Sequence, residues 1–224
     1  MNSEWAKSVE FLSMLPILKG EFMLEYTIEE ELWNEGYENV CGVDEAGRGP
    51  LCGPVVTAAV ILPRGLYIEG LNDSKKLTAK KREALFDVIC NSAIAYAITE
   101  GSVEEINATN ILEATMNSMR RSIETLSVPA DYALIDGNIA RNFNIPARPV
   151  IDGDATSPSI AAASILAKVT RDRLCVEMDK RYPEYGIAKH KGYGTKAHMD
   201  ALRKYGAAPE IYRTKFIRFL DKDK

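Results

Sequence analysis

The sequence predicts an α/β protein in which helices pack on a mixed sheet, and the order of its elements carries this prediction. Two apolar strands, expected at 40–44 and 55–62, come first and are joined by a short loop. Strand and helix patterns then alternate along the rest of the chain. With 224 residues, the chain has the length of one large domain, or of one domain with a small appendage.

The first 38 residues are expected to form a short, acidic and mostly helical leader. Between Glu21 and Trp33, the apolar residues Leu24, Ile28 and Leu32 recur every four positions. This spacing places them on one face of a helix.

The following elements are each marked by a local signal. The loop between the first two strands contains three glycines and two prolines, and Pro63 closes the second strand. Thr78 and Ser157 are helix caps, the latter with Pro158 at the first helical position. We expect helices at 78–91, 103–126 (mostly helical) and 157–181, and strands at 93–99, 132–136 and 148–151.

Composition indicates a soluble globular protein of a reducing compartment. Hydrophobic residues make up 46% and charged residues 27% of the chain. No apolar run approaches the roughly 18 to 20 residues that span a bilayer, and we expect no export signal. The four cysteines, at positions 41, 52, 90 and 175, form no C-x-x-C pair, which disfavours a zinc knuckle. We therefore expect a cytoplasmic protein without membrane contact.

Charge is unevenly distributed along the chain. The net charge of −4 argues against a protein that coats nucleic acid indiscriminately. Residues 1–40 hold nine acids and two lysines, whereas residues 186–224 hold ten Lys or Arg and four acids. The basic C-terminal section is suited to phosphate contacts, although a solvated charged surface explains the same pattern.

Four carboxylates stand at or just beyond the ends of apolar strands: Asp44, Glu45, Asp136 and Asp154. Gathered like charges raise one another's pKa and require a cation. Hard oxygen ligands favour Mg²⁺ or Mn²⁺ over zinc. Two such ions roughly 4 Å apart serve phosphodiester hydrolysis.

Each acid also has a simpler explanation. Asp136 with Gly137 and Asp152 with Gly153 are typical turn pairs, and Asp154 is close enough to Ser157 to assist its cap. Neighbours on a regular strand point to opposite faces, so Asp44 and Glu45 share a site only if the chain bends there. From spacing alone, both explanations stay open.

A series of motifs then resembles the type 2 ribonucleases H, the bacterial ribonuclease HII family. They occur in the family's order and together cover roughly residues 40–215. The matching segments are 42–51 (GVDEAGRGPL), 53–55 (GPV), 73–77 (DSKKL), 135–137 (IDG), 153–154 (GD), 159–169 (SIAAASILAKV), 171–172 (RD) and 190–195 (HKGYGT).

The resemblance implies a ribonuclease H-like mixed sheet flanked by helices, with a small helical C-terminal part. We expect a leader at 1–38, a catalytic core at 39–183 and a basic part contacting nucleic acid at 184–224. The resemblance also implies that Asp44, Glu45, Asp136 and Asp154 bind two Mn²⁺ or Mg²⁺ ions. Asp152 and Asp172 are then supporting residues, and we expect Asp172 to form a salt bridge or a packing contact.

The implied substrate is RNA–DNA hybrid, or duplex DNA containing ribonucleotides, cut by an in-line water to leave 3′-hydroxyl and 5′-phosphate ends. The resemblance assigns 2′-hydroxyl recognition to the backbone of Gly47, Arg48 and Gly49, and stacking at the sugar to Tyr193; a tight turn and an ordinary surface aromatic are the alternatives. Further substrate contacts are expected at Ser74, Lys75, Lys76, Ser164, Lys168 and Lys191, with Lys189 and Lys196 nearby. For His190 and His198 we expect structural or phosphate roles, not catalysis.

Two departures and two alternative functions remain. Cys52 stands where the family often has alanine, and residues 212–216 (YRTKF) match the family's ending only loosely. A related metal nuclease acting on other junctions is disfavoured by the pairing of residues 47–49 with Tyr193. A hybrid-binding protein without catalysis is disfavoured by the four acids. We expect a monomer.

Overall fold

A five-stranded sheet forms the centre of the chain in the computed structural model, which describes residues 24–222. Its strands are β1 (Val40–Ala46), β2 (Val55–Ile61), β3 (Ala95–Gly101), β4 (Tyr132–Asp136) and β5 (Ala147–Val150), in the order β3-β2-β1-β4-β5. The pairs β1–β2 and β2–β3 are antiparallel, and β1–β4 and β4–β5 are parallel. The predicted mixed sheet is confirmed.

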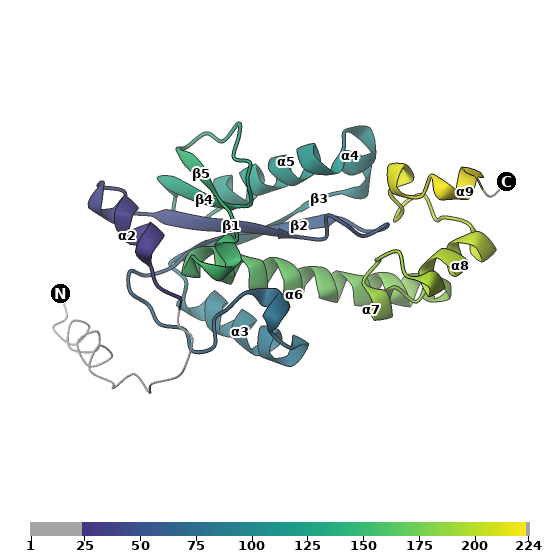
Figure 1. The fold of residues 1–224 in the computed structure, drawn as a ribbon, viewed down its shortest axis with the longest axis horizontal. Coiled ribbons are helices and arrows are strands. Elements are labelled where there is room, and N and C mark those ends of the chain that lie inside the picture. Colours follow the sequence, from purple (N-terminus) through teal and green to yellow (C-terminus); the bar gives the residue numbers. More distant parts are fainter. Residues whose placement is uncertain (1–23, 223–224) are drawn as a thin grey trace.

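Helices cover both faces of this sheet (Figure 1). On one face lie α6 (Pro158–Arg181) and α3 (Ala79–Ser92), and on the other lie α4 (Val103–Ala108) and α5 (Ile111–Glu124). The long helix α6 contacts the β1 backbone at Gly42, where an added Cβ would lie 2.2 Å from the Ile160 nitrogen. Glycine at this position therefore brings the helix directly onto the strand that carries Asp44 and Glu45.

Two apolar cores fill the space between the sheet and its helices. Val56, Ala58 and Val60 of β2 pack toward α6, whereas Val43 and Ile135 belong to the core beneath α5. Because side chains alternate along a strand, Asp44 and Asp136 project from the opposite face to Val43 and Ile135, toward α6.

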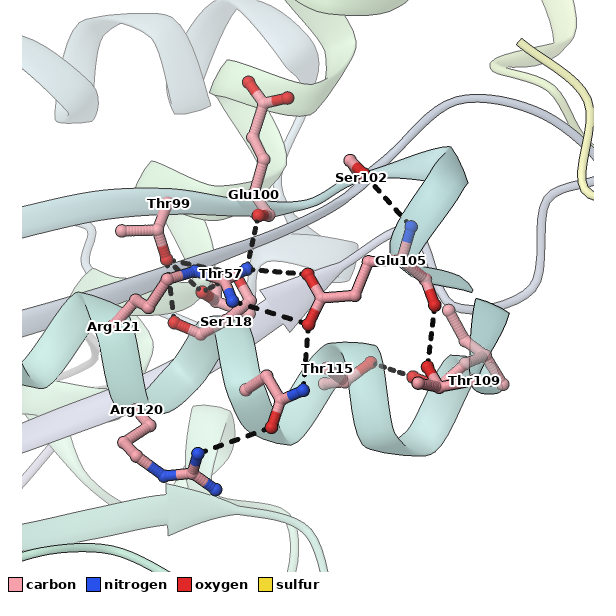
Figure 2. Close-up of polar contacts among 12 residues, drawn as sticks. Thr57, Thr99, Glu100, Ser102, Glu105, Thr109, Thr115, Ser118, Arg120 and Arg121 are labelled. Atoms are coloured by element: carbon pink, nitrogen blue, oxygen red, sulfur yellow. Dashed lines mark hydrogen bonds and ion pairs between the residues drawn. The ribbon is translucent and has the colours of Figure 1, made fainter. Parts of the chain in front are cut away.

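The α5 face also holds a buried polar network, which Figure 2 shows. The hydroxyl of Ser118 lies 2.8 Å from that of Thr57 and 3.0 Å from that of Thr99. Beside it, Glu105 accepts hydrogen bonds from Asn117 and Arg121. These contacts join β2, β3, α4 and α5, and they satisfy polar groups that would otherwise be costly to bury.

The described part of the leader packs onto the core. Helix α2 runs from Thr27 to Asn34, and Leu32 is buried against Val40 and Leu134. Its Glu29 is also buried, and Oε1 accepts hydrogen bonds from the Ser157 hydroxyl at 2.6 Å and the Ser159 amide at 3.2 Å. The leader is thereby tied to the N-terminus of α6.

Several predicted boundaries are confirmed, and others shift for local reasons. Strand 132–136 and the caps at Thr78 and Ser157 are as predicted. Strand β3 starts two residues later than expected because α3 continues to Ser92. The helical region 103–126 is divided because the Asn110 side chain accepts from the Glu113 amide and starts a new helix.

The predicted leader helix begins later than expected. Residues 1–23 of the predicted leader lie outside the described residues, and α2 starts at Thr27 because Leu24 and Tyr26 are packed in non-helical conformation into the core.

The C-terminal part lies at the far end of α6 (Figure 1). It consists of α7 (Ile187–His190), α8 (Lys196–Tyr205) and α9 (Phe219–Lys222), with the short 3₁₀ turns η3 (Pro183–Tyr185) and η4 (Thr214–Phe216). Buried Cys175 of α6 and Cys52 of the β1–β2 loop pack against this part. Across residues 24–222, no helix combines the length and apolar character needed to cross a bilayer.

Candidate active site

Asp44 and Asp136 stand side by side because their strands are parallel neighbours. The pair Val43 and Ile135 is in register between β1 and β4, and each acid is the next residue. Asp44 is 4% exposed, and its Oδ1 accepts from the Glu45 amide at 2.6 Å. Both carboxylates therefore project from the same face of the sheet, toward α6.

Asp154 reaches this place through a short turn that precedes α6. It lies in the 3₁₀ turn η2 (Gly153–Ala155) and is 4% exposed. The Gly153 amide donates to Asp136 Oδ1 at 2.9 Å, so the turn is bonded directly to β4. Asp154 Oδ2 accepts from Lys75 Nζ at 2.8 Å.

Glu45 belongs to the same electrostatic cluster although it is adjacent to Asp44. Its carboxylate forms an ion pair with Arg48 at 3.5 Å. Burial raises the pKa of Glu45, Arg48 opposes this, and the negative charge of Asp136 raises it further. Strand β1 continues to Ala46, and the chain turns at Gly47, which adopts a φ of +100°.

The acids destabilise one another's charged forms. Burial, followed by the charges of Glu45 and Asp136, raises the pKa of Asp44 well above its usual value, against hydrogen bonding from Ser164. Burial and then Asp154 raise the pKa of Asp136. The hydrogen bond to Asp154 raises the pKa of Lys75. The cluster is therefore short of positive charge.

The donor set fits a hard divalent cation. Within residues 24–222, no three His, Cys, Asp or Glu side chains are already arranged to hold a metal ion. The Lys75 ammonium instead bonds Asp154, and it stands in for a cation. A cluster of carboxylates suits Mg²⁺ or Mn²⁺, because these ions prefer oxygen ligands and offset the repulsion between like charges.

The loop at 47–49 and Tyr193, which are expected to recognise ribonucleotides, lie against each other, and the loop is next to Glu45. A Cβ on Gly49 would lie 3.4 Å from Cε1 of Tyr193, so the tyrosine ring stands against the loop. Tyr193 is 49% exposed, and the side chain of Arg48 is 50% exposed. Segments far apart in the sequence thus form one surface next to the cluster.

The other expected substrate contacts separate into exposed and buried groups. Lys75 and Lys76 are exposed, but the buried hydroxyls of Ser74 and Ser164 bond each other at 2.9 Å. Lys168 pairs with Asp172 at 2.7 Å, and Arg82 lies 3.6 Å from the same carboxylate. The salt bridge predicted for Asp172 is confirmed.

The remaining C-terminal candidates occupy the turn around Tyr193. Lys191 adopts a φ of +52° and its carbonyl faces inward, while Lys196 pairs with Asp200 at 2.8 Å. His190 and His198 stack with ring centroids 4.1 Å apart. Both bond backbone atoms of the turn, which is a structural role.

Three buried charged residues near the site had no role assigned from the sequence: Glu29, Arg171 and Arg213. Arg171 lies in a matching motif, but its partners are backbone carbonyls in distant loops. A charged residue inside an apolar helix pattern predicts that the side chain is buried with a polar partner, but the sequence pattern does not predict which residue that partner is.

The fold and the acid cluster define the class of protein, a nuclease with a ribonuclease H-like fold. Ribonuclease H2 from Pyrococcus horikoshii OT3 is similar, with a TM-score of 0.68 and 27% identity, over 83% of this chain and 98% of that one. The family model for ribonuclease HII matches residues 41–219. The chain therefore belongs to the ribonuclease HII family and is a ribonuclease H endonuclease.

Relatives of this family are close in sequence. Ribonuclease HII of Desulfitobacterium hafniense is 54% identical over 188 residues, which are 84% of this chain and 72% of the relative. Ribonuclease HII of Caldicellulosiruptor bescii is 51% identical over 193 residues, or 86% of this chain and 93% of the relative. The similarity thus extends over most of both proteins.

Proposed function

We propose that this endonuclease hydrolyses the RNA strand of RNA–DNA hybrids and also cuts at single ribonucleotides embedded in duplex DNA. One observation carries the proposal: Asp44 lies beside Asp136, the turn of Asp154 is bonded to Asp136, and Glu45, next to Asp44, pairs with Arg48 of the loop that contacts Tyr193. The surface formed by this loop and Tyr193 suits recognition of a sugar, and the acids suit hydrolysis of the adjoining phosphodiester.

Asp44, Glu45, Asp136 and Asp154 would hold two Mg²⁺ or Mn²⁺ ions. When bound, these ions supply an activated water and stabilise the leaving oxygen, which leaves 3′-hydroxyl and 5′-phosphate ends. The protein orients the acids beforehand, because the amides of Glu45 and Gly153 bond two of the carboxylates. Lys75 leaves Asp154 and becomes available to a phosphate oxygen of the substrate.

Recognition of the ribonucleotide is divided between backbone and side chains. The amides of residues 47–49 are suited to donate to the 2′-hydroxyl, and the Tyr193 ring to stack on the sugar. Arg48, Lys76 and Lys191 contact phosphates, and the basic part at 184–224 extends this contact along the DNA strand. Ser164 and Lys168, four residues apart on α6, share a helix face that is suited to contact the nucleic acid. The protein acts as a monomer, which light scattering tests.

A cleavage assay with three labelled duplexes tests the proposal. The duplexes are an RNA–DNA hybrid, a DNA duplex with one ribonucleotide, and the same duplex without it, each in Mg²⁺, in Mn²⁺ and in EDTA. We expect one cut on the 5′ side of the ribonucleotide and none in EDTA. Equal cutting of the all-DNA duplex would favour a junction nuclease, and binding without cutting in both metals would overturn catalysis.

A further inference from the structure

Two arginines are buried beneath the loop that carries Gly47, Arg48 and Gly49. Arg213 is 0% exposed and Arg171 is 2% exposed. Among the described residues, neither guanidinium has a carboxylate within 4.0 Å. Buried charges are normally paired, so these two must be stabilised in another way.

Arg213 is stabilised by the backbone of the loop itself. Its Nε donates to the carbonyl of Gly53 at 2.9 Å, and Nη2 donates to that of Gly47 at 2.7 Å. Its Nη1 donates to the carbonyls of Arg48 at 3.0 Å and Pro50 at 2.9 Å. Four carbonyls of one loop thus converge on one guanidinium, which gives the loop a defined shape.

Arg171 joins this loop to the turn that carries Tyr193. From α6, its Nη1 donates to the carbonyl of Lys191 at 2.9 Å, and its Nη2 donates to that of Cys52 at 3.3 Å. A Cβ on Gly47 would lie 1.9 Å from Arg171 Nε, so the loop can close over the arginine only with glycine there. The relative placement of the two recognition elements therefore depends on this side chain.

The inward carbonyls leave amides on the other side of the loop. The amides of Leu51 and Gly53 donate to the carbonyls of Gly192 and Ile211, both at 2.8 Å. The amides of residues 47–49 have no acceptor among the described residues. Because the C=O and N–H of one trans peptide unit point in opposite directions, holding the carbonyls of Gly47 and Arg48 inward directs the amides of Arg48 and Gly49 away from the arginines.

Arg213 stays charged in this position. Burial and then the charge of Arg171 lower the pKa of Arg213 to about 9, which leaves it protonated at neutral pH. The guanidinium therefore keeps all of its donors for the loop.

We infer that Arg213 and Arg171 are positioning residues for ribonucleotide discrimination: they hold the carbonyls of the 47–53 loop from inside and thereby aim the amides of Arg48 and Gly49, together with Tyr193, at a 2′-hydroxyl. The inference rests on the proposed function of this surface. The arginines act through the backbone and do not touch the substrate.

Charge-preserving variants test this inference. Arg213→Lys and Arg171→Lys keep a positive charge, but one ammonium cannot satisfy the same carbonyls. Arg120→Lys is the control, because Arg120 also donates to a backbone carbonyl, that of Asn142 at 2.7 Å, on the opposite face of the sheet. The dissociation constants of the single-ribonucleotide duplex and the all-DNA duplex are measured in EDTA, below the unfolding temperature of each variant.

We expect the preference of the wild type for the ribonucleotide duplex to fall at least about tenfold in Arg213→Lys, less in Arg171→Lys, and not in Arg120→Lys. A lower unfolding temperature with an unchanged preference in both variants would overturn the inference. A wild type without any preference would instead overturn the proposed function.

A second measurement uses the wild type alone and remains available if Arg213→Lys does not fold. Hydrogen exchange of the amides at 48 and 49 should be fast in the free protein. It should slow on binding the ribonucleotide duplex and not on binding the all-DNA duplex. Amides that are already protected in the free protein, or equally protected by both duplexes, would overturn the inference.

Discussion

The two buried charged clusters of this molecule have opposite signs and are stabilised in different ways. The arginines at 171 and 213 donate to five backbone carbonyls of the 47–53 loop and to one of the Tyr193 turn. The acids at 44, 45, 136 and 154 receive amide hydrogen bonds at only two members, two exposed cations pair with Asp154 and Glu45, and the charges of neighbouring acids raise the pKa of Asp44 and Asp136. The fold supplies carbonyl acceptors for every nitrogen of Arg213 and for both terminal nitrogens of Arg171, whose Nε has no acceptor among the described residues, and it leaves the acids short of positive charge.

This difference indicates that the arginines fix the arrangement of the chain, whereas the acids serve to bind a ligand. A buried charge whose partners are all within the fold stabilises one arrangement of the chain. A buried cluster of like charges is kept at a cost in stability, and it is useful only when a ligand brings the opposite charge. Variants of each cluster should therefore change different properties.

The largest expected effect is on catalysis, from Asp136→Asn. The amide oxygen can still accept from Gly153, but the variant lacks one of the charges that hold the cations. We expect cutting to fall at least about 100-fold, beyond what loss of a merely supporting group causes, with hybrid binding still measurable.

Asp131→Asn is the control at the other end of β4. Asp131 accepts from the amides of Glu38 and Asn39, far from the cluster, so its activity should be kept. Full activity of Asp136→Asn would remove Asp136 from the metal site.

Addition of metal ions should stabilise the wild type against unfolding more than it stabilises Asp136→Asn. A cation present at 100 times its dissociation constant adds about 2.7 kcal/mol to the free energy of unfolding. For a chain of this size, that corresponds to a rise in unfolding temperature of roughly 5–10 °C. Calorimetry with Mg²⁺ or Mn²⁺ against EDTA measures it. An equal rise in Asp136→Asn would show that the ions bind elsewhere.

The unfolding temperature of the metal-free protein should depend on pH, because the charged form of Asp44 is destabilised by burial. The pKa of Asp44 is raised in the fold, mainly by burial, so its protonated form is stabilising and this contribution is lost as pH rises through that pKa. Asp44→Asn should therefore unfold at a higher temperature than the wild type at pH 8 in EDTA. The difference should shrink as the pH falls toward 4, and a difference independent of pH would contradict the assignment.

The smallest expected effect comes from the neutral network on the opposite face (Figure 2). Ser118→Ala removes the hydroxyl that bonds Thr57 and Thr99. We expect the free energy of unfolding to fall by about 1–2 kcal/mol, while cutting stays within about twofold of the wild type. Denaturant unfolding gives the first value. A large loss of cutting would mean that this network also shapes the site.

Much of the fold could be predicted because its signals are local. Strand 132–136 follows from an apolar run that ends at an acid, and the Ser157 cap follows from a hydroxyl before proline. The division of region 103–126 was not predicted because Asn110, although a favourable N-cap residue, lies inside a region that is otherwise helical in pattern. The acids were found partly from strand ends and, as a set, from the family motifs.

What the sequence by itself determined is the identity of the elements and the supply of acids, glycines and basic residues, since helix period, caps and strand alternation depend on neighbouring residues. The tertiary structure alone decided which of these meet. Lys75 reaches Asp154 across 79 positions, and Arg213 reaches Gly47 across 166. Such pairs follow from strand order and from where α6 lies on the sheet, and no short stretch of sequence specifies either.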